Sequence, residues 1–129
     1  MKTLLINNQY NTGQQILLLR TDRGIKLIDI DTIVRIEAIS NYSKLFFSDN
    51  KTLVVAKLLH WFEEQLSSLS VKDNGGENED FIRIHRTHLV NKKFIRHYQS
   101  GKIKLSSGEY IDVAKRKKTL FLKLWYAAA

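Results

Sequence analysis

Short apolar runs, each followed by a turn sequence, occur along nearly the whole chain. Residues 14–20 (QQILLLR) and 24–30 (GIKLIDI), for example, flank a polar stretch from Thr21 to Gly24 that is typical of a tight turn. The same pattern predicts further strands at residues 34–39, 42–47, 53–56, 81–84, 94–99, 102–105 and 110–113. Many short strands joined by tight turns favour a fold built from antiparallel sheets.

Two segments follow the helical period instead. In residues 57–69 (KLLHWFEEQLSSL), large apolar side chains recur at spacings of three and four and form one face, which consists of Leu58, Leu59, Phe62, Leu66 and Leu69. Residues 117–125 carry a second stripe, formed by Leu120, Phe121, Leu124 and Trp125. We expect a turn-rich connection at residues 85–93 and an acidic loop at residues 71–80. The sequence therefore predicts a mostly β fold with two short helices.

The length of 129 residues allows one domain with a hydrophobic core and is too short for two. We expect a loose lead-in at residues 1–13, one folded domain at residues 14–126, and a cloning scar at the three terminal alanines. No apolar run approaches a membrane span, and the chain turns polar at Asn7, so a cytoplasmic protein is expected. The absence of cysteine excludes disulfides, thiolate zinc sites and cysteine nucleophiles.

The net charge of +8 is distributed unevenly along the chain. Residues 1–80 hold nine Lys and Arg against eleven Asp and Glu, whereas residues 81–129 hold twelve against two. Such a basic C-terminal part favours a polyanionic partner, with nucleic acid as the first interpretation. An anionic membrane surface and a merely solvated basic face are the two alternatives.

Three motifs in order resemble the LytTR family of DNA-binding domains. Residues 35–43 (RIEAISNYS) resemble its "IEA..NY" opening, and residues 81–91 (FIRIHRTHLVN) resemble its signature F-x-R-I-H-R-S-x-L-V-N, with Thr87 in place of serine. The run from Val113 to Arg116 is similar to its "V-S-R-R" ending, although Ala114 replaces the serine and puts one small polar contact in doubt. The resemblance covers residues 14–125.

The resemblance implies an elongated stack of antiparallel sheets with two short helices. It also implies sequence-specific binding of double-stranded DNA by a transcriptional regulator, through loops that enter successive major grooves of a bent duplex. Most members are output domains of response regulators, which belong to two-component systems. A receiver domain fused before Met1 in the natural protein, and a second copy of the chain on repeated half-sites, stay open as partners.

Candidate DNA contacts lie first in the loop at residues 40–44 and in the basic run after Val113. Ser43 and Lys44 are the candidates in the loop, whose other interpretation is an ordinary polar turn. Lys115, Arg116 and Lys117 are the candidates in the basic run, whose other interpretation is a solvated patch. The family resemblance places Arg116 where an arginine reads a base, and the planar guanidinium can bond guanine O6 and N7 together.

The segment at residues 83–93 supplies the remaining candidates. Arg86, Lys92 and Lys93 are expected to face phosphates, and Arg86 also to reach a base edge. His85 and Asn91 have two open interpretations: their side chains either contact DNA or tie the turn together.

Catalytic and cofactor chemistry are not expected. His85 and His88 form H-x-x-H, but two ligands do not make a metal site. His85-Arg86-Thr87 is a single H-x-T, whereas the phosphodiesterases that carry this motif need two copies. An RNA- or single-strand-binding β module stays open as the alternative function. Such modules display surface aromatics for base stacking, and only Tyr42 and Tyr98 fall outside apolar patterns.

Overall fold

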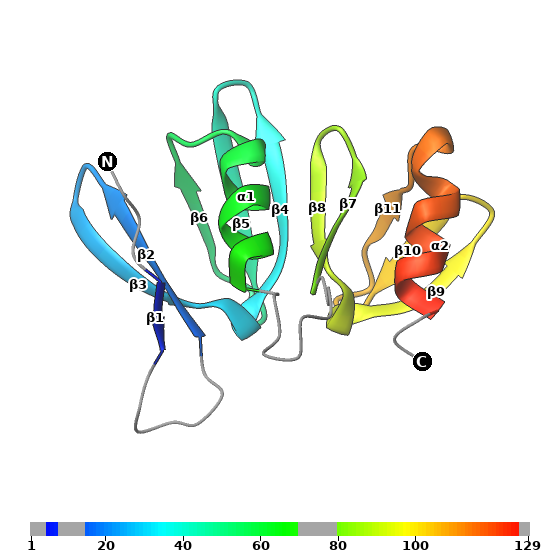
Figure 1. Ribbon diagram of the computed structural model, residues 1–129, viewed down its shortest axis with the longest axis horizontal. Helices are drawn as coiled ribbons and strands as arrows, with labels where there is room; N and C mark the ends of the chain where they lie inside the picture. The colour runs from blue at the N-terminus through cyan, green and yellow to red at the C-terminus, as the bar shows by residue number, and fades with distance from the viewer. Residues whose placement is uncertain (1–4, 8–14, 70–79, 127–129) are drawn as a thin grey trace.

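The computed structural model describes residues 5–7, 15–69 and 80–126, which form three antiparallel sheets and two helices (Figure 1). The central sheet has five strands in the order β6 (Thr52–Val55), β5 (Tyr42–Phe47), β4 (Ile33–Ile39), β8 (His88–Asn91) and β7 (Phe81–His85). The first sheet contains β1 (Leu5–Asn7), β2 (Gln15–Thr21) and β3 (Gly24–Asp29). The last sheet has the order β11 (Tyr110–Asp112), β10 (Lys102–Leu105) and β9 (Ile95–Gln99).

The helices are α1 (Leu59–Leu69) and α2 (Lys118–Tyr126), and the described connections include the single 3-10 turns η1 (Ile30–Thr32), η2 (Lys92–Phe94) and η3 (Lys115–Lys117). The sheets follow one another along the long axis of the molecule (Figure 1). The predicted mostly β fold, an elongated series of antiparallel sheets with two short helices, is therefore confirmed. Neither helix in the described ranges has the length and apolar character needed to cross a membrane.

The central sheet carries a hydrophobic core on each face. On one face, Ile36 of β4 and Leu89 of β8 belong to a core that contains Phe62 of α1. On the other face, Val90 of β8 belongs to a core that contains Phe121 of α2 and the inner residues of the last sheet. Consecutive residues of a strand point to opposite faces, so β8 contributes to both cores with neighbouring residues.

Strand β8 lies inside the segment that was predicted to be turn-rich, so that prediction was wrong for residues 88–91. A strand buried on both faces lacks the alternation of apolar and polar residues that identifies a half-buried strand. Two residues of the predicted apolar helix faces are exposed rather than buried. Leu58 is 58% exposed because α1 begins one residue later, and Leu120 is 50% exposed on α2.

Some sequence predictions concern residues at the limits of the described ranges. Within the expected lead-in, residues 5–7 form β1, which pairs antiparallel with β2. The expected loop at residues 71–80, apart from Asp80, lies outside the described residues. So do the side chain of Leu69 and the three terminal alanines.

Phe62 provides a test of the first core. Its side chain is fully buried between α1 and the central sheet, so Phe62→Ala should leave a cavity and lower the free energy of unfolding by about 3 kcal/mol. Urea unfolding of the two proteins measures this difference. Glu64→Ala on the exposed face of the same helix is the matched control. An unchanged midpoint for Phe62→Ala would show that α1 does not pack on this sheet.

Candidate nucleic-acid interface

Three connections that are distant in sequence lie together at one edge of the central sheet. The β4–β5 turn, the β7–β8 turn and the segment that leads from β11 into α2 all lie at the top of Figure 1. Backbone hydrogen bonds join them: the Ala38 N–H donates to the Thr87 carbonyl at 2.9 Å, and the Ala114 N–H donates to the Ile84 carbonyl at 2.7 Å. We call this region, residues 39–42, 85–88 and 113–117, the turn edge.

Arg83 fixes the β7–β8 turn to α1. Its Nη1 forms an ion pair with Glu63 of α1 at 2.8 Å. Its Nε donates to the His85 carbonyl at 2.9 Å, and its Nη2 donates to the Arg86 carbonyl at 2.6 Å. One guanidinium thus binds a helix and two carbonyls of the turn, and its charge is compensated within the protein.

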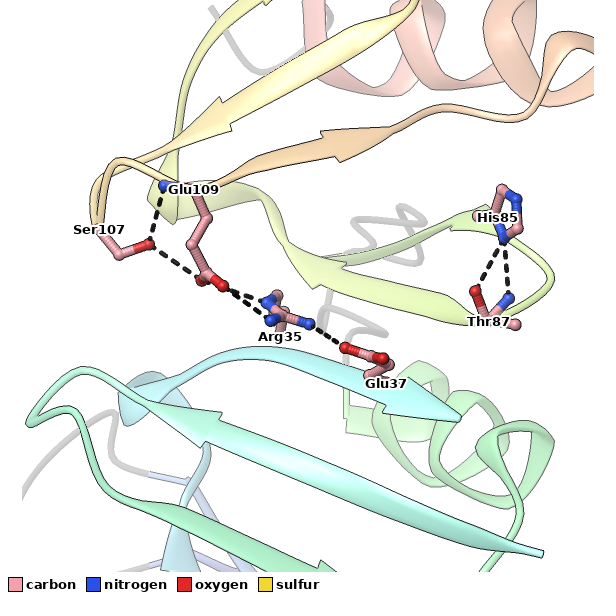
Figure 2. A network of polar contacts seen from close by, with 6 residues as sticks. All are labelled: Arg35, Glu37, His85, Thr87, Ser107 and Glu109. Carbon is pink, nitrogen blue, oxygen red and sulfur yellow. Dashed lines mark hydrogen bonds and ion pairs between the residues drawn. The ribbon is translucent and has the colours of Figure 1, made fainter. Parts of the chain in front are cut away.

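The imidazole of His85 forms hydrogen bonds within the same turn. Its Nδ1 lies 2.9 Å from Thr87 Oγ1 and accepts a hydrogen bond from the Thr87 N–H at 3.2 Å (Figure 2). Thr87, which replaces the serine of the family signature, therefore supplies both its backbone N–H and its hydroxyl to the ring. Of the two interpretations of His85, its role in tying the turn is confirmed.

A basic hollow of about 330 Å³ opens where α1, β7 and η3 meet. The Arg83–Glu63 pair compensates two of its charges. Among the described residues, no carboxylate forms an ion pair with the three other cations of the lining, so the hollow is positively charged. Its lining consists of Glu63, Arg83, His85, Arg86, Ala114, Arg116 and Lys117.

An ionic network centred on the buried Arg35 connects the central sheet to the last sheet. Arg35 of β4 is only 5% exposed, and its Nη2 and Nε bind the Glu109 carboxylate at 2.8 and 3.3 Å (Figure 2). Its Nη1 binds Glu37 at 2.8 Å, and its guanidinium carbon lies 3.6 Å from the centroid of the Phe46 ring. The hydrogen bonds from Arg35 hold the pKa of Glu109 below its ordinary value of 4.5, although burial opposes this shift.

Two predicted DNA contacts are buried. Ser43 is fully buried on β5, and its Oγ donates to the Lys57 carbonyl at 2.6 Å, so its prediction as a DNA contact was wrong. Asn91 is 2% exposed: its Nδ2 donates to the Ile33 carbonyl at 3.0 Å and its Oδ1 accepts from the Lys93 N–H at 3.2 Å. The structural interpretation of Asn91 is therefore confirmed, and its interpretation as a contact is not. Ser43 lies between the exposed Tyr42 and the half-buried Lys44, and Asn91 lies between the buried Val90 and the half-buried Lys92, so the polar character of these residues does not show that they are buried.

The predicted cations separate into two groups. Arg86, Lys115 and Arg116 are exposed at the turn edge, and Lys117 is half-buried beside them. Lys44, also half-buried, follows the β4–β5 turn by two positions, with its Nζ 5.2 Å from the centroid of the Phe46 ring.

Lys92 and Lys93 lie elsewhere. They belong to η2, which follows the opposite end of β8 from the turn edge. The Nζ of Lys93 lies 3.8 Å from Asp31 Oδ1 of η1. The structure therefore does not bring these two lysines together with the other predicted contacts.

Arg83 and Arg35 are the important residues that sequence reasoning missed as structural groups. Arg83 binds Glu63, 20 residues away, and Arg35 binds Glu109, 74 residues away, in addition to the nearby Glu37, so no local pattern predicts the two long-range pairings. The two rings of the H-x-x-H motif, from His85 and His88, have centroids 5.4 Å apart. Within the described residues, no group of three or more His, Cys, Asp or Glu side chains is arranged to hold a metal ion.

Comparison with known proteins identifies the family. The sequence profile of the LytTR family, described as the LytTr DNA-binding domain, matches residues 23–125. The chain belongs to this family. Its fold is similar to the solved LytTr DNA-binding domain of a protein from Bacillus cereus that is described as a methyl-accepting/DNA response regulator. The two chains are 21% identical, with a TM-score of 0.63 over 84% of this chain and 94% of the other. No curated protein matches the sequence.

The ionic network of this LytTR domain predicts a particular dependence of stability on pH. Since the folded-state pKa of Glu109 is lowered, its stabilising effect is fully present above pH 4.5 and is lost as the pH falls through the folded-state pKa. Glu109→Gln should therefore be less stable than the parent at pH 7, and the difference should shrink toward zero at acidic pH. Urea unfolding between pH 7 and pH 3 measures it.

Glu64→Gln is the control for this measurement, because its carboxylate lies on the exposed face of α1 and, among the described residues, pairs only with the exposed His60. A stability difference for Glu109→Gln that stays constant with pH would contradict a charge-dependent network.

Proposed function

We propose that this LytTR domain binds specific sequences in double-stranded DNA as a transcriptional regulator, with the turn edge facing the duplex. Membership of a family of DNA-binding domains supports the class of partner. The relative from Bacillus cereus belongs to a protein described as a response regulator, and we propose the same setting here. A fused receiver domain and a second copy on repeated half-sites are the protein partners that this proposal includes.

The single observation that carries the proposal is that four cations without an ion-pair partner among the described residues gather at the turn edge. Arg35, Arg83 and Lys102 each pair with a carboxylate at 2.8 Å. Among the described residues, the cations at the turn edge, Arg86, Lys115, Arg116 and Lys117, form no ion pair. Cations without an ion-pair partner are free to bind DNA phosphates and base edges. Hydrogen bonds that fix the protein backbone at this edge also fix the positions from which these side chains extend.

Within this edge we assign base reading to Arg116 and Arg86. Both side chains are exposed, and a guanidinium can bond the O6 and N7 atoms of one guanine at the same time. Lys44, Lys115 and Lys117 supply charge for phosphates. We further propose that the β4–β5 turn and the η3 region approach successive major grooves, since they belong to different parts of the long axis of the molecule (Figure 1).

One observation favours the alternative of RNA or single-strand binding. Tyr42, which begins β5 at the turn edge, is 51% exposed and offers a ring on which a base can stack. The ring of Tyr98, in contrast, packs against Phe121, and its hydroxyl is buried. Competition between duplex DNA, single-stranded DNA and RNA of the same sequence separates the alternative from duplex binding.

Arg116 provides the test of sequence-specific binding. A site selected from random duplexes should bind Arg116→Ala more weakly by roughly 1 to 3 kcal/mol, with relaxed preference at one or two base pairs. Arg116→Lys keeps the charge but loses the planar fork, so binding to non-specific duplexes should survive while discrimination falls. The measurement is binding to the selected site and to its single-base variants.

Lys93→Ala is the matched control, because Lys93 is an exposed cation away from the turn edge. We expect it to change neither affinity nor discrimination appreciably. Discrimination by Arg116→Lys equal to that of the parent would contradict base reading by Arg116. Preference for RNA or single strands over duplex would contradict the proposed class of partner.

A further inference from the structure

The hydrogen bonds of His85 determine which of its nitrogens carries a proton. Because the Thr87 N–H donates to Nδ1 at 3.2 Å, Nδ1 acts as an acceptor, and a neutral ring must carry its proton on Nε2. Figure 2 shows this second nitrogen on the side of the ring away from Thr87. Among the described residues, no group forms a hydrogen bond with Nε2. The turn therefore orients one N–H donor that forms no hydrogen bond with the described residues.

The surroundings of this donor suit an anion. His85 lines the basic hollow beside Arg86 and Arg116, neither of which has an ion-pair partner among the described residues. The carboxylate of Glu63, which also lines the hollow, is already bound by Arg83 at 2.8 Å. An oxyanion in the hollow would meet an N–H donor of fixed direction, with long flexible cations around it. A phosphodiester is the oxyanion that a duplex bound at the turn edge presents.

We infer that the Nε2–H of His85 donates to one backbone phosphate of the duplex, which lies in the basic hollow. The inference rests on the proposed function and deepens it, since it assigns His85 a second contact in addition to its bond within the turn. The chemistry of the side chains assigns different contacts to His85 and to the two arginines. His85 positions the phosphate and carries no base information, whereas Arg86 and Arg116 have the length to reach base edges.

Two substitutions separate the two roles of the ring. In His85→Asn the side-chain oxygen occupies the region of Nδ1 and can still accept from the Thr87 N–H, while the distal donor is lost. In His85→Gln the longer side chain places an amide N–H₂ near the former Nε2, while the acceptor for Thr87 is lost. A phosphate contact predicts that Asn is the damaging replacement, and a purely structural role predicts that Gln is.

The experiment combines these variants with duplexes in which one phosphate at a time is replaced by an uncharged methylphosphonate. The parent should lose about tenfold in affinity at one particular phosphate of the selected site, as expected for a hydrogen bond to a charged group. His85→Asn should bind the unmodified site about tenfold more weakly than the parent and be insensitive to methylphosphonate at that position. His85→Gln should remain sensitive there. His97→Asn, at an exposed histidine of β9, is the control and should behave as the parent.

Either of two results would overturn the inference: His85→Asn binds as tightly as the parent, or it loses the same factor as the parent at every methylphosphonate. A larger defect in His85→Gln than in His85→Asn would assign the ring to the turn alone. These outcomes are distinct from failure of the proposed function, in which the parent itself would show no preference for any duplex.

Discussion

The pairing of β4 with β8 is the interaction on which the rest of this structure depends. Only three residue pairs form this ladder, Arg35 with Val90, Ile36 with Leu89 and Glu37 with His88. It joins the β4–β5–β6 meander to the β7–β8 hairpin in one sheet, so that α1 packs on one face and the last sheet with α2 on the other. Because the strands are antiparallel, it also brings the β4–β5 and β7–β8 turns to the same edge.

Four arginines of this domain fall into two groups that differ in their ion-pair partners. Arg35 and Arg83 are held by carboxylates and connect one element to another, from β4 to the turn before Tyr110 and from β7 to α1. Removing Glu63 would leave Arg83 without its carboxylate partner in a partly buried site, and removing both Glu37 and Glu109 would do the same to Arg35, which is costly. Arg86 and Arg116, on the turn edge, have no such partner among the described residues. A count of basic residues after position 80 therefore overstates the charge that a duplex would meet.

Local patterns predicted most strands and both helices, because period and turn chemistry are local properties. Local patterns failed where burial in the folded protein determines whether a segment is a strand or whether a polar side chain is exposed. Leu89 and Val90 face different cores, so β8 lacks alternation, and Ser43 is a polar residue that a carbonyl of a later segment satisfies. The candidate contacts were recognised as polar and basic, but their grouping was not predictable. Lys93 and Arg86 are only seven positions apart, yet β8 extends between them and places them at opposite ends of a strand.

The central claim is that one edge of the sheet, formed by three separate connections, binds duplex DNA. Mapping of backbone amide chemical shifts during titration with a selected duplex tests it most directly, because it reports on every part of the chain at once. The account predicts that the large changes fall at residues 39–44, 85–88 and 113–117, with little change at η2 and in the β2–β3 hairpin. Large changes centred on η2 or on that hairpin, with the turn edge unaffected, would contradict it.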